Sequence, residues 1–96
     1  MIGLYRDAPG CHLMQINIEF YASLMQYLPP GKSRHRREIR VDDGLSVRAL
    51  VEQFHIPEKM AHIVLVNGHF VEVDMRAGRT LAEGDVVSIW PPVAGG

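Results

Sequence analysis

The stretch EIRVDDGLSVRALVEQF (residues 38–54) changes from the residue pattern of a strand to that of a helix. In its first half, Ile39 and Val41 alternate with charged side chains, which is the pattern of a strand with one buried face. Asp43-Gly44 then predicts a turn. We therefore expect the segment that begins at residue 38 to form a half-buried strand ending in this turn.

The second half of the stretch predicts an amphipathic helix. Ser46 is a good N-cap residue, because its side-chain oxygen can accept a hydrogen bond from the first helical turn. After it, apolar residues recur at spacings of three and four, as in a helix that lies against a sheet: Val47, Leu50, Val51 and Phe54. Pro57 is expected to end the helix, since proline has no backbone N–H to donate.

Other segments on both sides of this stretch have the patterns of strands. Residues 15–21 (QINIEFY) alternate strictly between apolar and polar side chains. The apolar run IVLVN (63–67) predicts a strand buried on both faces, and Asn67-Gly68 predicts a hairpin that leads into a partner strand over residues 69–73. DVVSIW (85–90) predicts a last strand with alternate apolar side chains turned inward.

A short helix and the order of the elements complete the prediction of the fold. ASLMQYL (residues 22–28) has apolar residues at helical spacing, and Pro29-Pro30-Gly31 stops it after about two turns. One main helix that crosses a mixed sheet of about four to five strands satisfies the two-layer and right-handed crossover rules. We therefore predict an α+β fold of the β-grasp, ubiquitin-like type.

Composition limits the class of protein. A chain of 96 residues with 47% hydrophobic and 22% charged residues is expected to form one ordinary globular domain. The single cysteine, Cys11, excludes an intramolecular disulfide and favours a reducing, cytoplasmic compartment. No apolar run is long enough for a membrane helix, and a signal-peptide pattern is missing from the sequence, so no membrane partner is expected.

We divide the chain into three parts. Residues 1–13 have no sustained period and are expected to be a mobile N-terminal extension, residues 14–90 form the β-grasp domain, and residues 91–96 form an extended tail that ends in Gly-Gly. Charge is unevenly distributed: residues 1–40 hold six basic and three acidic side chains, and residues 41–96 hold four basic and eight acidic ones. The net charge of −1 argues against a nucleic-acid partner.

Gly95 and Gly96, the last two residues, are the most informative feature for function. They have no side chains, so the end of the chain can pass through a narrow channel and deliver its carboxylate to the active site of another protein. A carboxylate is a poor acyl donor and needs activation, for example as an acyl-adenylate made from ATP. A frayed end or a truncation explains the same dipeptide without any function.

At this point the sequence resembles a known family. The segments IEFYASLMQYLP (18–29), LVNG (65–68) and LAEGDVVSIWPPVAGG (81–96), in this order, are similar to the ubiquitin-like sulfur carriers of the molybdopterin synthase small subunit and thiamine sulfur-carrier type. The ending, a Gly-Asp turn, an apolar strand with an aromatic residue and PPVAGG, looks closest to the molybdopterin synthase small subunit. The resemblance covers residues 14–96.

The resemblance implies a protein co-substrate rather than an enzyme. An E1-like adenylating enzyme would use ATP to activate the carboxylate of Gly96, and a sulfurtransferase would supply the sulfur of a thiocarboxylate. The large subunit of molybdopterin synthase, or another acceptor enzyme, would then take the sulfur. Gly95 would keep the tail thin, and the carrier would bind no cofactor and no metal.

Other functions share these features. The sulfur of a related carrier can go to thiamine or cysteine synthesis instead of molybdopterin. A ubiquitin-like modifier would join Gly96 to lysine side chains, and a β-grasp interaction module would have a tail without chemistry.

A binding surface is expected beside the tail. Alternation places Trp90 and Tyr21 opposite inward-facing neighbours, so both aromatic side chains are predicted to be exposed. With Phe70 they match positions where the family docks its partners, and exposed aromatic residues are frequent interface anchors. The remaining residues assigned to partner binding belong to the tail: Pro91, Pro92 and Val93. Alternatively, any of the three aromatic side chains caps the small core.

Two further features carry weaker predictions. Five cations lie within nine residues, which fits a solvated loop and strand face or a surface that steers a partner or contacts phosphate: Lys32, Arg34, Arg36, Arg37 and Arg40. The five histidines lack the spacing of a zinc site, so no metal is expected. Neither Cys11 nor its neighbour His12 is expected to act in catalysis.

Overall fold

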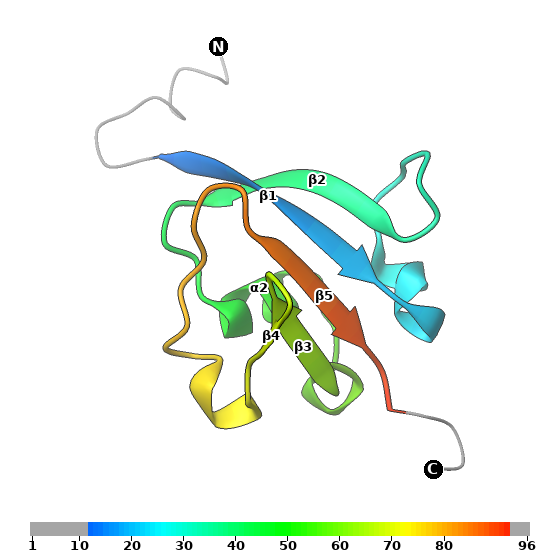
Figure 1. The fold of residues 1–96 in the computed structure, drawn as a ribbon. Helices are drawn as coiled ribbons and strands as arrows, with labels where there is room; N and C mark the ends of the chain where they lie inside the picture. Colours follow the sequence, from blue (N-terminus) through cyan, green and yellow to red (C-terminus); the bar gives the residue numbers. More distant parts are fainter. Residues whose placement is uncertain (1–11, 93–96) are drawn as a thin grey trace.

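The computed structural model describes residues 12–92, which form a five-stranded sheet packed against one main helix (Figure 1). The strand order is β2-β1-β5-β3-β4; β5 runs parallel to β1, and the other neighbouring strands are antiparallel. This mixed sheet confirms the predicted β-grasp fold. The elements are β1 (Leu13–Phe20), 3-10 helix η1 (Ala22–Tyr27), β2 (Arg36–Asp42), α2 (Val47–Gln53), 3-10 helix η2 (Glu58–Met60), β3 (Ile63–Val66), β4 (His69–Phe70), 3-10 helix η3 (Val73–Met75) and β5 (Val86–Trp90).

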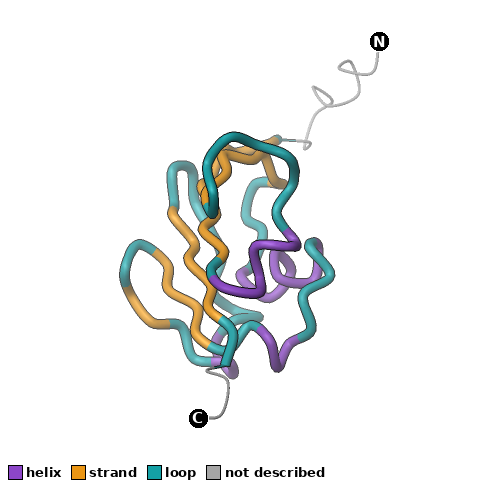
Figure 2. The backbone as a smooth tube through the Cα atoms, turned by 90° about the vertical axis from the view of Figure 1, so that its right-hand side faces the viewer, coloured by secondary structure: helices purple, strands orange, loops and turns teal. Residues whose placement is uncertain are grey.

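The core lies between one face of the sheet and the helices. Figure 2 shows the strands on one side of the molecule and the helical segments on the other. The predicted inward side chains of the two central strands are buried in this core: Met14, Ile16, Ile18 and Phe20 of β1, with Val87 and Ile89 of β5. The opposite face, called the outer face below, is left for solvent or a partner.

The helix α2 begins as predicted but ends earlier. The Ser46 hydroxyl accepts a hydrogen bond from the backbone N–H of Ala49 at 3.1 Å. The helix stops because His55 turns into the left-handed region at φ 60°, and the N–H of Ile56 donates to the carbonyl of Val51. Pro57 was the wrong terminator: it precedes η2 instead.

Two strand predictions also need correction. Strand β3 is buried on one face only, since α2 covers one side of the sheet: Val64 and Val66 are buried, while Ile63 is exposed. Strand β4 has two residues instead of five, because the chain leaves the sheet after Val71 donates to the carbonyl of Val64. The predicted Asn67-Gly68 hairpin is confirmed, with φ of 53° and 84° at its two turn residues.

The ends of the chain fall partly outside this description. Residues 1–11 and 93–96 are outside the described residues, and with them Val93, Gly95, Gly96 and most of the predicted extension. His12 and Leu13, also assigned to that extension, lie against the domain instead: Leu13 begins β1, and the His12 carbonyl accepts a hydrogen bond from Asp43. None of the helices between residues 12 and 92 is long and apolar enough to cross a membrane.

Candidate functional site

The tail leaves the domain from a firmly held point at the centre of the sheet. Strand β5 lies between β1 and β3, so the last residue of the strand, Trp90, is held from both sides. The N–H of His62 donates to the Trp90 carbonyl at 3.0 Å, and the N–H of Tyr21 donates to the Ile89 carbonyl at 3.1 Å. Pro91 follows directly and is half-buried, whereas Pro92 is exposed.

Three aromatic rings stack beside this point. The rings of Tyr21 and Trp90 lie almost parallel, with centroids 4.5 Å apart and an angle of 4° between their planes. The His35 ring covers the other side of Tyr21, with centroids 4.7 Å apart. Both predicted anchors are therefore half-buried by each other rather than fully exposed. Neither ring caps the core, because their neighbours Phe20 and Ile89 face inward.

Glu19 holds Tyr21, the middle ring of this stack. Its carboxylate accepts hydrogen bonds from the Tyr21 hydroxyl and the Ser88 hydroxyl, each at 3.0 Å, and from the Arg36 guanidinium at 2.8 Å. The Glu19 side chain is only 17% exposed. Sequence reasoning missed Glu19, because Ser88 is 69 residues away in the chain and only the sheet register brings the two together.

These surroundings change the pKa of the Tyr21 phenol. Burial raises its pKa above 10.0, and the hydrogen bond to Glu19 and the charge of that carboxylate raise it further, while Arg36 acts in the opposite direction.

This shift predicts a change in stability at alkaline pH. Because the folded-state pKa of Tyr21 is raised, its contribution is fully present below pH 10.0 and is lost as the pH rises through the folded-state pKa. We expect the difference in unfolding free energy between the native sequence and Tyr21→Phe to narrow as the pH rises from 10.0 to the folded-state pKa of Tyr21. Urea unfolding of both proteins from neutral to alkaline pH measures this difference, and a gap that widens with pH would contradict the assignment.

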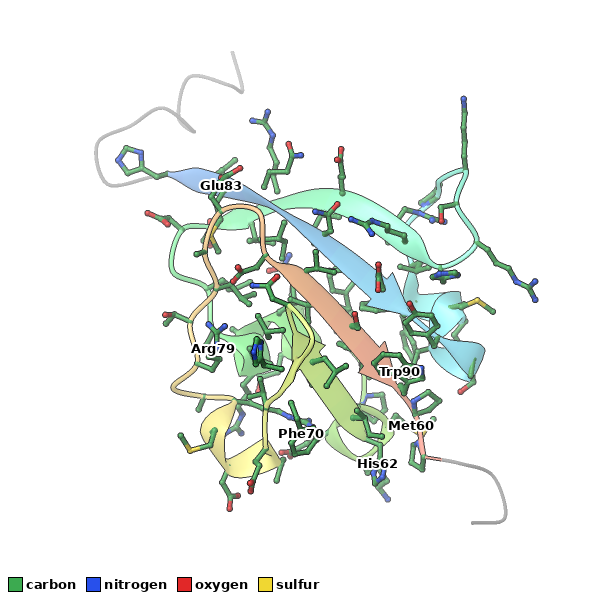
Figure 3. The ribbon with its side chains drawn as sticks, viewed as in Figure 1. Met60, His62, Phe70, Arg79, Glu83 and Trp90 are labelled. Atoms are coloured by element: carbon green, nitrogen blue, oxygen red, sulfur yellow. The ribbon has the colours of Figure 1, made fainter. Side chains whose placement is uncertain are left out.

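An apolar patch continues from the stack across the outer face. Ile63 pairs with Trp90 and Leu65 pairs with Ser88 and Phe70, so these side chains share a face. Phe70 is 57% exposed, which excludes its alternative role as a cap of the core. Figure 3 shows Trp90 and Phe70 on the two sides of β3. We call the following set the outer-face patch: Tyr21, Ile63, Leu65, Phe70 and Trp90.

An open groove of about 650 Å³ lies beside Phe70, between the η2 region and η3. Arg76 lines it and is only 4% exposed. Its guanidinium donates to the carbonyls of Ala61 at 2.7 Å and His62 at 3.3 Å, and thereby ties η3 to the start of β3. Burial lowers the pKa of Arg76, and the charge of Glu58 partly opposes this effect.

The described part of the site offers a surface for binding. Among residues 12–92, no group of three or more histidine, cysteine or acidic side chains lies together in a way that could hold a metal ion. What the described residues provide is a rigid base for the tail and an apolar surface next to it. Such an arrangement can present the end of the chain to another protein.

Comparisons with solved structures find the same fold in other proteins. The chain is similar to the HVO 2177 protein of Haloferax volcanii, with 28% identity, a TM-score of 0.68 and coverage of 94% of this chain and 92% of that one. It is also similar to SAMP1 (small archaeal modifier protein 1) of the same organism, with 25% identity, a TM-score of 0.58 and coverage of 85% and 99%.

A third structure shares the fold at lower identity. It is the complex of subunits 1 and 2 of the molybdopterin-converting factor from Helicobacter pylori, with 24% identity, a TM-score of 0.52 and coverage of 86% and 100%. No curated protein matches the chain. The model of the ThiS family matches residues 18–96, from within β1 to the last glycine. With this match and the β-grasp sheet on which the tail is mounted, the chain belongs to the ThiS family of ubiquitin-like sulfur carriers.

Proposed function

We propose that this carrier accepts sulfur as a thiocarboxylate on Gly96 and donates it in the synthesis of molybdopterin. The observation that carries the proposal is the family match through Gly96, together with the fixed exit of the tail at Trp90. The PPVAGG ending points to molybdopterin among the sulfur pathways. Carriers of this type are non-catalytic co-substrates, so the reactive group is the α-carboxylate alone.

The chemistry takes place in the active sites of partners. In the first step, a carboxylate oxygen of Gly96 attacks the α-phosphorus of ATP on an E1-like adenylating enzyme, and pyrophosphate leaves. In the second step, the terminal sulfur of a persulfide supplied by a sulfurtransferase attacks the acyl carbon, and AMP leaves. A thiol then attacks the other sulfur of the acyl disulfide, which forms a disulfide and releases the thiocarboxylate. Activation is required because AMP is a far better leaving group than the oxide of a free carboxylate.

The domain contributes the geometry of delivery. Gly95 and Gly96 keep the tail thin, and Pro91-Pro92 restrict its backbone at the exit from β5. The outer-face patch supplies apolar area for docking, with the ring of Trp90 already held in one orientation by Tyr21. Val93 connects this rigid base to the glycines.

The acceptor of the sulfur is expected to be a large synthase subunit. Support comes from the Helicobacter pylori complex, in which a protein of this fold is assembled with a second subunit of the molybdopterin-converting factor. The same outer-face patch would serve the adenylating enzyme and the large subunit in turn, since each must receive the same tail.

Intact mass spectrometry of the protein from its own cells tests this function. We expect a mass increase that corresponds to one oxygen replaced by sulfur, located in the C-terminal peptide. Deletion of Gly96 is the matched control, because it leaves the described domain unchanged and removes the reactive group. A native protein that keeps an unmodified carboxylate when sulfur is abundant would contradict the proposal.

A second candidate function is protein modification, which the similarity to SAMP1 favours. In that case the activated Gly96 acyl group would transfer to a lysine amine and form an amide bond. Conjugates of high mass that disappear on deletion of Gly96, with no sulfur on the free protein, would support this second function over the first.

A further inference from the structure

The loop between η1 and β2 is strongly positive and has an ordered shape. We call residues 29–37, which are this loop and the first two residues of β2, the basic loop. Within residues 12–92, the ion pairs involve Arg36 with Glu19 and Arg48 with Glu52. The charges of Lys32, Arg34 and Arg37 in the loop are therefore not neutralised by any carboxylate of the described chain, and Lys32 and Arg34 are exposed.

Arg37 gives the loop its shape. Its Nε donates to the carbonyl of Pro29 at 2.7 Å, and its Nη1 donates to the carbonyls of Ser33 at 2.5 Å and Arg36 at 2.7 Å. The chain passes so close to this guanidinium that a Cβ at Gly31 would lie 2.2 Å from Nε. The loop thus wraps its own carbonyl groups around Arg37 and leaves Lys32 and Arg34 exposed.

The basic loop is joined to the base of the tail. The carbonyl of His35 accepts a hydrogen bond from the N–H of Phe20 at 2.9 Å, which fixes the end of the loop to β1. The ring of His35 lies on Tyr21, which in turn lies on Trp90. In Figure 1 the loop lies on the same side of the molecule as the ends of β1 and β5.

Charge is unevenly distributed across the tail base. The basic loop on the β2 side holds cations without a carboxylate partner, whereas the groove on the β4 side is lined by both signs, with Glu58 and Glu72 beside Lys59 and Arg76. An acidic partner surface therefore gains an attraction opposite the loop that the groove does not supply. The order imposed by Arg37 means that little loop entropy is lost on binding.

We propose that the basic loop is a preformed docking site for an acidic surface of the adenylating enzyme that receives the tail. This inference rests on the proposed function and adds the chemistry of the partner surface. A nucleic acid fits less well, because three unpaired cations are few for phosphate binding. In addition, Glu38, Asp42 and Asp43 are exposed on and after β2, and would repel phosphate.

Steady-state adenylation tests the inference with the full chain, ATP and the adenylating enzyme of the same organism. Pyrophosphate release is measured against carrier concentration for the native sequence and for Lys32→Glu/Arg34→Glu. We expect the KM for the carrier to rise about tenfold or more at low ionic strength, with kcat unchanged. Near 1 M salt, where the screening length is about 3 Å, the difference should disappear.

A double variant with the same change in net charge is the control. Arg48→Glu/Arg79→Glu changes two arginines outside the loop, and its KM should stay within about twofold of the native value, since both lie by α2 and η3, away from the docking site. Thermal unfolding of both variants checks that the fold is retained. Both double variants change the net charge by the same amount. A difference in KM between them therefore depends on where the charges lie.

Each of the other possible outcomes contradicts either the docking role or the proposed function. Adenylation of the native chain with equal KM for both double variants overturns the docking role and leaves the proposed function intact. No adenylation of the native chain overturns the proposed function and the docking role with it. Binding of a single-stranded DNA oligonucleotide that Lys32→Glu/Arg34→Glu abolishes, with KM unchanged, assigns the loop to nucleic acid instead.

Discussion

Trp90→Ala is expected to weaken binding of the carrier to the proposed adenylating enzyme by about 2 kcal/mol or more, which is roughly a 30-fold increase in Kd. Trp90 joins the outer-face patch to the tail, so the variant removes a large anchor at the point where the tail must enter the partner. The loss of the stack with Tyr21 costs the isolated domain only about 1 kcal/mol. Titration calorimetry with the enzyme and urea unfolding of the free protein measure the two effects separately.

Met75→Ala is the matched control for this prediction. Met75 is 64% exposed in η3 and lies outside the outer-face patch. Its replacement removes an exposed apolar side chain outside the patch, so the Kd for the enzyme should stay within about twofold of the native value. If Trp90→Ala binds the enzyme as tightly as Met75→Ala, the stack is a structural feature of the domain and the patch is not the docking surface.

Arg76→Ala is expected to lower the free energy of unfolding by about 2–4 kcal/mol, the largest effect on stability among the residues around the site. The variant leaves the carbonyls of Ala61 and His62 without their donor and opens a cavity under η3. For a domain of this size, such a loss lowers the Tm by roughly 10 °C or more. Calorimetry at neutral pH gives the value directly.

Arg48→Ala provides the comparison, because Arg48 is 60% exposed and pairs with Glu52 on the surface of α2. Its loss should cost less than about 0.5 kcal/mol. A similar small loss for Arg76→Ala would show that desolvation of the guanidinium cancels its hydrogen bonds. Arg76→Met separates the two effects, since it keeps most of the buried volume without the donors.

The patterns that predicted the fold are local ones. The alternation in β1 and β5, the spacing of Val47 and Leu50 in α2, and the Asn67-Gly68 turn each depend on residues within a few positions of one another. The errors arose where a distant element decides the outcome. Strand β3 looked buried on both faces, but its outer face is open because no element within residues 12–92 packs on that side of the sheet.

The candidate site, too, was predicted only in part from the sequence. The diglycine ending and the aromatic residues at positions 21, 70 and 90 are visible in the sequence, and their family supplies the chemistry. The contacts that hold these aromatic side chains cannot be predicted from the sequence. Glu19 contacts Ser88, and Tyr21 contacts Trp90, only because β1 pairs in parallel with β5. From the sequence alone, the alternation of β1 predicts only that Glu19 is exposed, and it does not predict a hydrogen-bonding role.

Composition and local periodicity thus determined that the chain forms a β-grasp domain with a glycine-ended tail, since strand and helix patterns depend on short-range sterics and on burial of one face. The tertiary structure alone decided that Trp90 is clamped by Tyr21, that Arg37 shapes the basic loop and that Arg76 is buried. These contacts need a sheet register and loop closures, which bring together groups that the chain order keeps apart.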